Sequence, residues 1–387
     1  MFHLKHIFTS IVLLLTMAAG VTSCIEPPLK LPAEEVMVEG PDVIVDLDVV
    51  WNVDVDWDHD WYYGWDETDV RIWGNIEYPH PSNFEVRRYF LGNETRVPHT
   101  QVDAFTILGT RFRRTYEFGY YDMLIWSNID SRDHTQVVKV IESDLDETIG
   151  TTTVTRAMKI SRTDDNLYAL YNQPEIYYSA YPRDIYISRN FDDYDYFDEE
   201  TGTWVKRLNC TLEPLVYIYL VQVILHNNID NRVLGTNGDC AISAMAARTN
   251  VNTGHTYDDP CMVYFNSRMK RDLDVNGEKC NIIGGMLTTY GLCDMEGYGR
   301  DTRSPFYTGS RDDLNNYVVL ELNMSGGSTQ SLKVDVTDQM RRQCHGGIIT
   351  IHLDCNEIPN PHEGGASGSL FNPTVEDYEE LIYEIPM

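Results

Sequence analysis

The chain has 387 residues, a formal net charge of −30 at pH 7 and eight cysteines. Its length exceeds what one hydrophobic core usually serves, so we expect two domains. A surface this acidic repels phosphate backbones, which argues against nucleic acid as a partner.

The N-terminus carries an export signal. Lys5 and His6 precede an apolar stretch from Ile7 to Ala19, which is too short and wrongly flanked for a spanning helix. The residues Val21-Thr22-Ser23-Cys24 then fit a bacterial lipobox, with a branched apolar residue and two small residues before the cysteine. We therefore predict a signal peptide over residues 1–23, a lipid at Cys24 that holds the mature chain to a membrane, and a tether over 24–39.

The first half of the chain is rich in strand patterns. Val43 to Val50 and Val53 to Trp57 alternate apolar and acidic side chains, as a half-buried strand does. Further short runs are Val70 to Ile76, Phe84 to Phe90, Phe105 to Leu108, Tyr121 to Trp126, Gln136 to Ile141 and Ile185 to Ser188. Many short strands without a helical period predict an all-β fold of antiparallel sandwich architecture.

A domain boundary is expected near the acidic segment Asn190 to Gly202, which we interpret as a solvated loop. The first domain would span residues 40–205 and the second 206–387, with a flexible acidic tail. Strands are predicted in the second at Leu215 to His226, Cys261 to Phe265, Cys280 to Met286, Tyr317 to Leu322, Leu332 to Val336 and Gly347 to Leu353. One helix is predicted at Cys240 to Arg248 from its alanines. The last stretch, Thr374 to Met387, fits a short helix or a strand.

Seven cysteines other than Cys24 all lie in the second half: Cys210, Cys240, Cys261, Cys280, Cys293, Cys344 and Cys355. An exported chain meets an oxidising compartment, so disulfides are possible, with the pairing open and at least one thiol left over. If Cys344 and Cys355 flank one extended strand, they are too far apart to pair. No CxxC pair indicates a zinc or redox site.

An aromatic block is the strongest candidate for a binding surface: Trp51, Trp57, Trp61, Tyr62, Tyr63, Trp65 and Trp73. If exposed, Trp57, Trp61, Tyr62, Tyr63 and Trp65 would stack sugars or contact a protein partner. The alternative is that alternate members pack in the core of a sheet. Several coplanar rings on one open face would favour glycan binding, and buried rings would favour a role in the fold.

No catalytic motif is present. Gly365 to Ser369 lacks the closing glycine of a nucleophile elbow, and no HExxH, GxxxxGK or dinucleotide-binding glycine pattern occurs. The acidic run Asp54 to Asp60 lacks the glycine and the glutamate of a calcium loop. We therefore predict a protein that is not an enzyme, with no cofactor and no metal site, although a triad assembled from distant residues stays open.

Several ordered stretches resemble the fimbrillin superfamily of gut and oral Bacteroidota, particularly its minor-fimbrium anchor subunits and related lipoproteins. They are Leu212 to Leu215, Ile242 to Ala246, Gly284 to Leu292, Val334 to Met340 and, in the first half, Gly119 to Asn128. The Val334 to Met340 stretch is the most specific of them. Seven mature cysteines are more than this superfamily leads one to expect.

The resemblance implies two transthyretin-like β-sandwich domains in tandem, in an outer-membrane lipoprotein at the cell surface. It further implies an anchor or accessory subunit of a fimbria-like assembly that binds fimbrial subunits by strand addition and supports adhesion. Pro32 to Val45 and Thr374 to Met387 are the candidates for exchange. Lys30 lies too close to Cys24 to mark a maturation site that keeps the anchor. The alternative function is a surface glycan-binding lipoprotein that uses the aromatic block.

Overall fold

The computed structural model describes residues 40–49, 61–92, 100–127, 139–141, 149–151, 168–228, 230–297, 309–311 and 313–358. The chain divides into one unit over Met1–Gly40 and another over Pro41–Met387, and only the second is considered below. The signal peptide, Cys24, Trp57 and the Thr374 to Met387 tail lie outside the described residues. Within the described part, no helix has the length and hydrophobicity needed to cross a membrane.

The first half of the second unit forms a nine-stranded sheet system in the order β3-β2-β5-β9-β12-β1-β4, with β10 against β5 and β11 against β12. The strands are β1 (Asp42–Val49), β2 (Asn83–Gly92), β3 (Thr100–Leu108), β4 (Arg111–Thr115), β5 (Gly119–Ser127), β9 (Tyr178–Ala180), β10 (Ile185–Ile187), β11 (Tyr196–Asp198) and β12 (Thr203–Pro214). Alternate side chains of β1, β2 and β5, among them Val45, Val86 and Met123, share one buried cluster. The period-two pattern therefore does form the core here.

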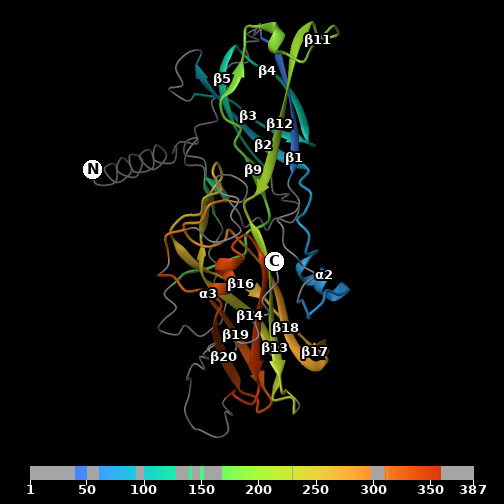
Figure 1. Cartoon of the computed structure of the whole chain (residues 1–387), viewed down its shortest axis with the longest axis vertical. Helices are drawn as coiled ribbons and strands as arrows, with labels where there is room; N and C mark the ends of the chain where they lie inside the picture. The colour runs from blue at the N-terminus through green and yellow to red at the C-terminus, as the bar shows by residue number, and fades with distance from the viewer. Residues whose placement is uncertain are drawn as a thin grey trace, which may run out of the picture. The chain divides into compact units, whose positions relative to one another are not determined.

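The second half forms a four-stranded sheet, β17-β18-β13-β21, and, together with β8 from the first half, a five-stranded sheet, β20-β19-β14-β16-β8. The strands are β8 (Leu170–Tyr171), β13 (Tyr217–His226), β14 (Val233–Ala246), β16 (Pro260–Asn266), β17 (Arg268–Val275), β18 (Glu278–Thr289), β19 (Tyr317–Met324), β20 (Thr329–Asp335) and β21 (Gly347–Asp354). Both sheets contribute to one large buried cluster that includes Val223, Phe265 and Leu320. Figure 1 shows β13, β18 and β17 as neighbouring strands. A small third sheet joins β6 (Lys139–Ile141), β7 (Ile149–Thr151) and β15 (Arg248–Asn250).

The fold is mostly β with several sheets, as predicted, but the sheets are mixed rather than antiparallel. β1 runs parallel to β12, β13 to β21, and β8 to β16. Each of these pairs joins strands far apart in the sequence, and a long connection lets the second strand return in the same direction. β12 crosses residues 205 and 206, where the domain boundary was placed. The division into two domains stays a prediction.

Two predicted elements are wrong. Cys240 to Arg248 was predicted as a helix, but residues 233–246 form β14, in which both faces are buried from Cys240 onward. Small alanines fit a strand that is covered on both sides, and burial outweighs their helix propensity. Val70 to Ile76 was predicted as a strand, but Glu67–Trp73 is the helix α2. The acidic segment Asn190 to Gly202 also contains a 3-10 turn, η2 (Phe191–Asp193), and β11 rather than loop alone.

The outer edge of β21 is closed by two glutamine side chains. The helix α3 (Thr337–Arg342) and its C-cap residue supply Gln339 and Gln343. Gln339 donates to the carbonyl of Thr350 at 2.8 Å and accepts its N–H at 2.9 Å. Gln343 does the same for Ile348, at 2.9 and 2.8 Å. These amides take the place of a neighbouring strand, so this edge is protected against pairing with another chain.

We predict that the double variant Gln339→Ala and Gln343→Ala self-associates. The freed N–H and C=O groups of Ile348 and Thr350 offer a template for strand pairing. Sedimentation velocity over a range of concentrations should show a dimer that the wild type lacks. Arg342→Ala, on the same helix, is the matched control, because its guanidinium donates to the carbonyl of Asp338 within that helix. A double variant with the sedimentation behaviour of the wild type would contradict the assignment.

Candidate functional site

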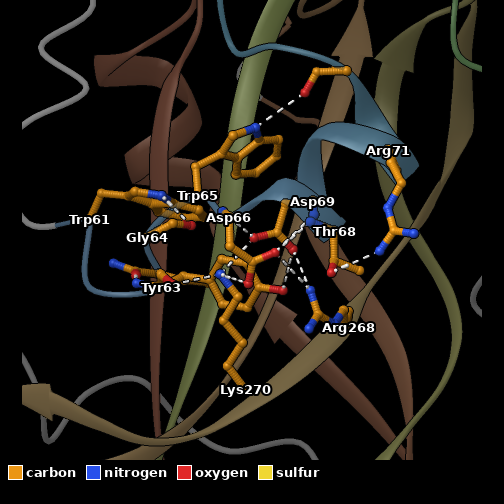
Figure 2. A network of polar contacts seen from close by, with 12 residues as sticks. Trp61, Tyr63, Gly64, Trp65, Asp66, Thr68, Asp69, Arg71, Arg268 and Lys270 are labelled. Carbon is orange, nitrogen blue, oxygen red and sulfur yellow. Dashed lines mark hydrogen bonds and ion pairs between the residues drawn. The ribbon is translucent and has the colours of Figure 1, made fainter.

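The described members of the aromatic block lie in the segment from Trp61 to Ile76, which contains α2 (Figure 2). Tyr63 is 1 % exposed, whereas Trp61, Tyr62 and Trp65 are half-buried. Trp57 lies outside the described residues. We call residues 61–76 the aromatic segment.

Tyr63 packs on the face of the β17-β18-β13-β21 sheet, in a cluster with Ile224, Cys280 and Ile282. A Cβ atom on Gly284 of β18 would lie 2.5 Å from its ring, so the ring occupies the space that a side chain would fill. Lys270 Nζ lies 4.1 Å from the centre of the same ring, on a cation–π contact. The aromatic segment therefore covers this face of the sheet.

A buried carboxylate holds the aromatic segment in place. Asp69 is fully buried; it accepts a hydrogen bond from Arg268 Nη1 at 2.8 Å and forms an ion pair with Lys270 Nζ at 2.6 Å, both from β17 (Figure 2). The Tyr63 hydroxyl also donates to Asp69 at 3.2 Å. A carboxylate without water is tolerated only when it is paired and hydrogen-bonded, and these contacts meet that condition.

The Asp69 carboxylate also takes part in the N-terminal cap of α2. Asp66 is the N-cap and accepts the N–H groups of Thr68 and Asp69, while Asp69 accepts the N–H of Asp66 at 2.9 Å, a capping box. Desolvation acts to raise the pKa of Asp66, but the N–H of Asp69 and the Lys270 ammonium outweigh it and hold that pKa well below its usual range. Burial and the Asp69 carboxylate raise the pKa of Tyr63, so its hydroxyl stays protonated and donates.

The rings do not form a flat platform. Trp61 is tilted by 55° against Tyr63 and by 46° against Trp65, and Trp65 by 33° against Trp73. The indole N–H of Trp61 donates to the Gly64 carbonyl, and that of Trp65 to the Gly74 carbonyl. Stacking on a sugar needs open, coplanar faces, so this geometry favours the role in the fold.

A polar pocket lies elsewhere, between β9, β12 and the turn after β15. It has a volume of about 320 Å³, and its lining includes Arg183, Asn209, Glu213 and Asn252. Asn252 is 3 % exposed, and within the described chain neither polar atom of its side chain has a hydrogen-bond partner. An unsatisfied buried amide costs free energy, so the pocket suits a polar ligand. Sequence analysis missed it because its lining comes from three separate segments.

β3 is an edge strand with exposed apolar side chains. Among the described residues β3 pairs only with β2. Val102 and Leu108 are 43 % and 81 % exposed. The strand carries no lysine or proline, and its single charge, Asp103, is bound to Arg88 at 3.3 Å. Lysine and proline, which often protect an edge against strand addition, are thus absent from β3, although the register with β2 shifts at Val102.

The seven cysteines considered for disulfides are all buried, and among the described residues none is in a disulfide bond: Cys210, Cys240, Cys261, Cys280, Cys293, Cys344 and Cys355. Burial raises the pKa of Cys210 to about 12, which keeps that thiol protonated and unreactive. Cys344 and Cys355 flank β21, the arrangement under which they cannot pair. Disulfide formation stays a prediction.

No protein-family model matches the sequence, and no curated protein matches it. Two crystal structures described as putative adhesins, from Bacteroides ovatus and Bacteroides thetaiotaomicron, match with TM-scores of 0.46 and 0.43 and identities of 14 % and 9 %. They cover 83 % and 82 % of this chain, and 94 % and 93 % of their own. The fimbrial anchor protein Mfa2 from Porphyromonas gingivalis matches with a TM-score of 0.36 and 12 % identity, over 81 % of this chain and 92 % of its own. The chain is similar in structure to these proteins.

We predict that Asp69→Asn destabilises the protein by about 2–3 kcal/mol, because Arg268 and Lys270 lose their buried carboxylate partner and keep only the exposed Asp66. The expected loss in the free energy of unfolding is smaller than for a fully buried pair, because Arg268 is 35 % exposed and solvent screens its charge. Urea unfolding followed by tryptophan fluorescence measures the change. Glu67→Gln, an exposed position in the same first turn, is the control and should unfold like the wild type. Equal midpoints for the two variants would show that the carboxylate does not hold the segment.

Proposed function

We propose that the protein is a lipid-anchored anchor or accessory subunit of a fimbria-like assembly on the cell surface, with no catalytic role. Its sheets would form two transthyretin-like sandwich domains in tandem, and the lipid at Cys24 would hold it in the outer membrane. Partner subunits would bind by strand addition and so support adhesion. The lipobox and the fimbrillin-like stretches of the sequence support this proposal.

The structural observation that carries it is the β3 edge. Among the described residues β3 has a side with no paired strand and carries no lysine or proline, and such an edge can accept a strand from another subunit. Leu108, at 81 % exposure, would lose its contact with water in such a complex. The β21 edge is closed by Gln339 and Gln343, so of these two edges we assign strand addition to β3.

The alternative is a surface glycan-binding lipoprotein. The tilted rings of the aromatic segment argue against a stacking platform. The polar pocket with the unsatisfied amide of Asn252 is the observation that favours a small polar ligand such as a sugar. The two functions predict that different proteins co-purify with this chain from the membrane.

The experiment is affinity purification of the tagged full-length protein from the membranes of its own cells, with mass spectrometry of co-purifying chains and of the mature N-terminus. We expect fimbrillin-like subunits and an acylated Cys24. Recovery alone, or with glycan-import components, would contradict the proposal and favour the alternative.

We further predict that Val102→Asp with Leu108→Asp lowers subunit recovery at least about tenfold, because two carboxylates would be desolvated at the strand interface. Thermal unfolding should not change, since both side chains are exposed. Leu234→Asp, at a position 45 % exposed in β14, is the control. Undiminished recovery with the double variant would exclude β3 as the binding edge without excluding the fimbrial role.

A further inference from the structure

Three potential metal ligands converge at one end of the β17-β18-β13-β21 sheet. His226 is the last residue of β13, Glu278 is the first of β18, and Cys280 follows two residues later. One donor atom of each lies within 4.8 Å of the others. His226 Nδ1 is 3.2 Å from Glu278 Oε2 and 3.7 Å from Cys280 Sγ.

The sheet itself fixes these positions. In the antiparallel β13–β18 pair Leu225 is opposite Asn281, so the next residue of β13, His226, comes beside Cys280, the residue before Asn281. Glu278 and Cys280 are two residues apart in one strand, so they point to the same face. Ligands on strand backbones are more precisely placed than ligands on loops.

The donor set and its spacing suit zinc. Zinc binds thiolate, imidazole and carboxylate in a tetrahedron, whose neighbouring ligand atoms are about 3.3–3.6 Å apart at the usual bond lengths. The two distances at His226 Nδ1, 3.2 and 3.7 Å, lie close to that range. Cys280 is 2 % exposed and the Glu278 side chain is 54 % exposed, so an ion has a path from solvent on the glutamate side.

The second ring nitrogen of His226 is hydrogen-bonded, as it usually is in a histidine that binds a metal. His226 Nε2 lies 2.8 Å from His352 Nδ1, and the two rings stack with their centres 5.1 Å apart. A histidine that binds a metal almost always hydrogen-bonds through its second nitrogen, which fixes the ring and the tautomer. If Nε2 donates to His352, the lone pair of Nδ1 points toward the carboxylate and the sulfur.

We propose that His226, Glu278 and Cys280 bind one zinc ion, which ties the end of β13 to the start of β18. Binding forms a zinc–sulfur bond and releases the thiol proton to solvent. A water molecule fills the fourth position. The ligands are 52 and 54 residues apart across two strands, which is why no local spacing in the sequence signals them.

The test uses full-length protein purified in detergent, stripped with a chelator and dialysed against zinc, with bound metal measured by plasma mass spectrometry. We expect one zinc per chain. Cobalt in place of zinc should give the near-ultraviolet charge-transfer band of a thiolate ligand. Cys280→Ser should abolish that band, and Glu278→Ala, at an exposed position that leaves folding intact, should weaken zinc binding at least about tenfold.

Cys240→Ser is the matched control, because Cys240 is equally buried at 2 % exposure but lies in β14 with its thiol bonded to Ser267. It should keep both the zinc and the cobalt band. Three results would each overturn the proposal: wild-type protein that binds no more zinc than the Cys280→Ser variant, a cobalt spectrum that Cys280→Ser does not change, or Cys280 found in a disulfide by peptide mapping.

Discussion

The buried carboxylate of Asp69 determines how the aromatic segment is arranged. It closes the capping box that starts α2, accepts the Tyr63 hydroxyl, and pairs with two cations of β17. Without this carboxylate, Arg268 and Lys270 would keep only the more exposed Asp66 as a counter-charge, at 3.4 and 3.2 Å. A charge that is removed from water must be paired, so the segment and the sheet can join only in a register that brings these three groups together.

The aromatic segment helps to determine which surfaces of the β17-β18-β13-β21 sheet are already covered. One face of the β17-β18-β13-β21 sheet contributes to the large core, and the segment covers the other. The end of that covered face carries His226, Glu278 and Cys280, and the glutamines of α3 close the β21 edge. Most of this sheet is therefore committed to the fold or to the proposed ion. Among the described residues, β3 in the other half of the unit pairs only with β2, and it is the edge to which we assign strand addition.

Part of this architecture could be predicted from sequence. Strands with regular alternation or long β-branched runs, such as β1, β2 and β13, were placed within one or two residues. β14 was missed because alanines carry helix propensity, whereas its burial depends on neighbours that the sequence does not reveal. α2 was missed because Val70 to Ile76 was interpreted as a short strand-like run, although Asp66 and Asp69 already had the spacing of a capping box.

The candidate sites were less predictable than the strands. The aromatic block was visible, but whether its rings were stacked or packed depended on Arg268 and Lys270, about 200 residues along the chain. The polar pocket, the closed β21 edge and the zinc ligands all combine residues from segments with no common motif. Long-range pairing of strands creates such sites, and a period of two within one strand gives no information about its neighbours.

Hydrogen–deuterium exchange of the wild-type protein, resolved by peptide mass spectrometry, tests most directly whether the aromatic segment is part of the fold. If the Asp69 contacts hold it against the sheet, the amides of residues 61–76 exchange as slowly as those of β18. The amides of Val70 and Gly74, which donate within α2, should be among the slowest. Exchange of the whole segment at the rate of an unstructured peptide would contradict the account. It would favour the alternative in which the aromatic rings are exposed and form a binding surface.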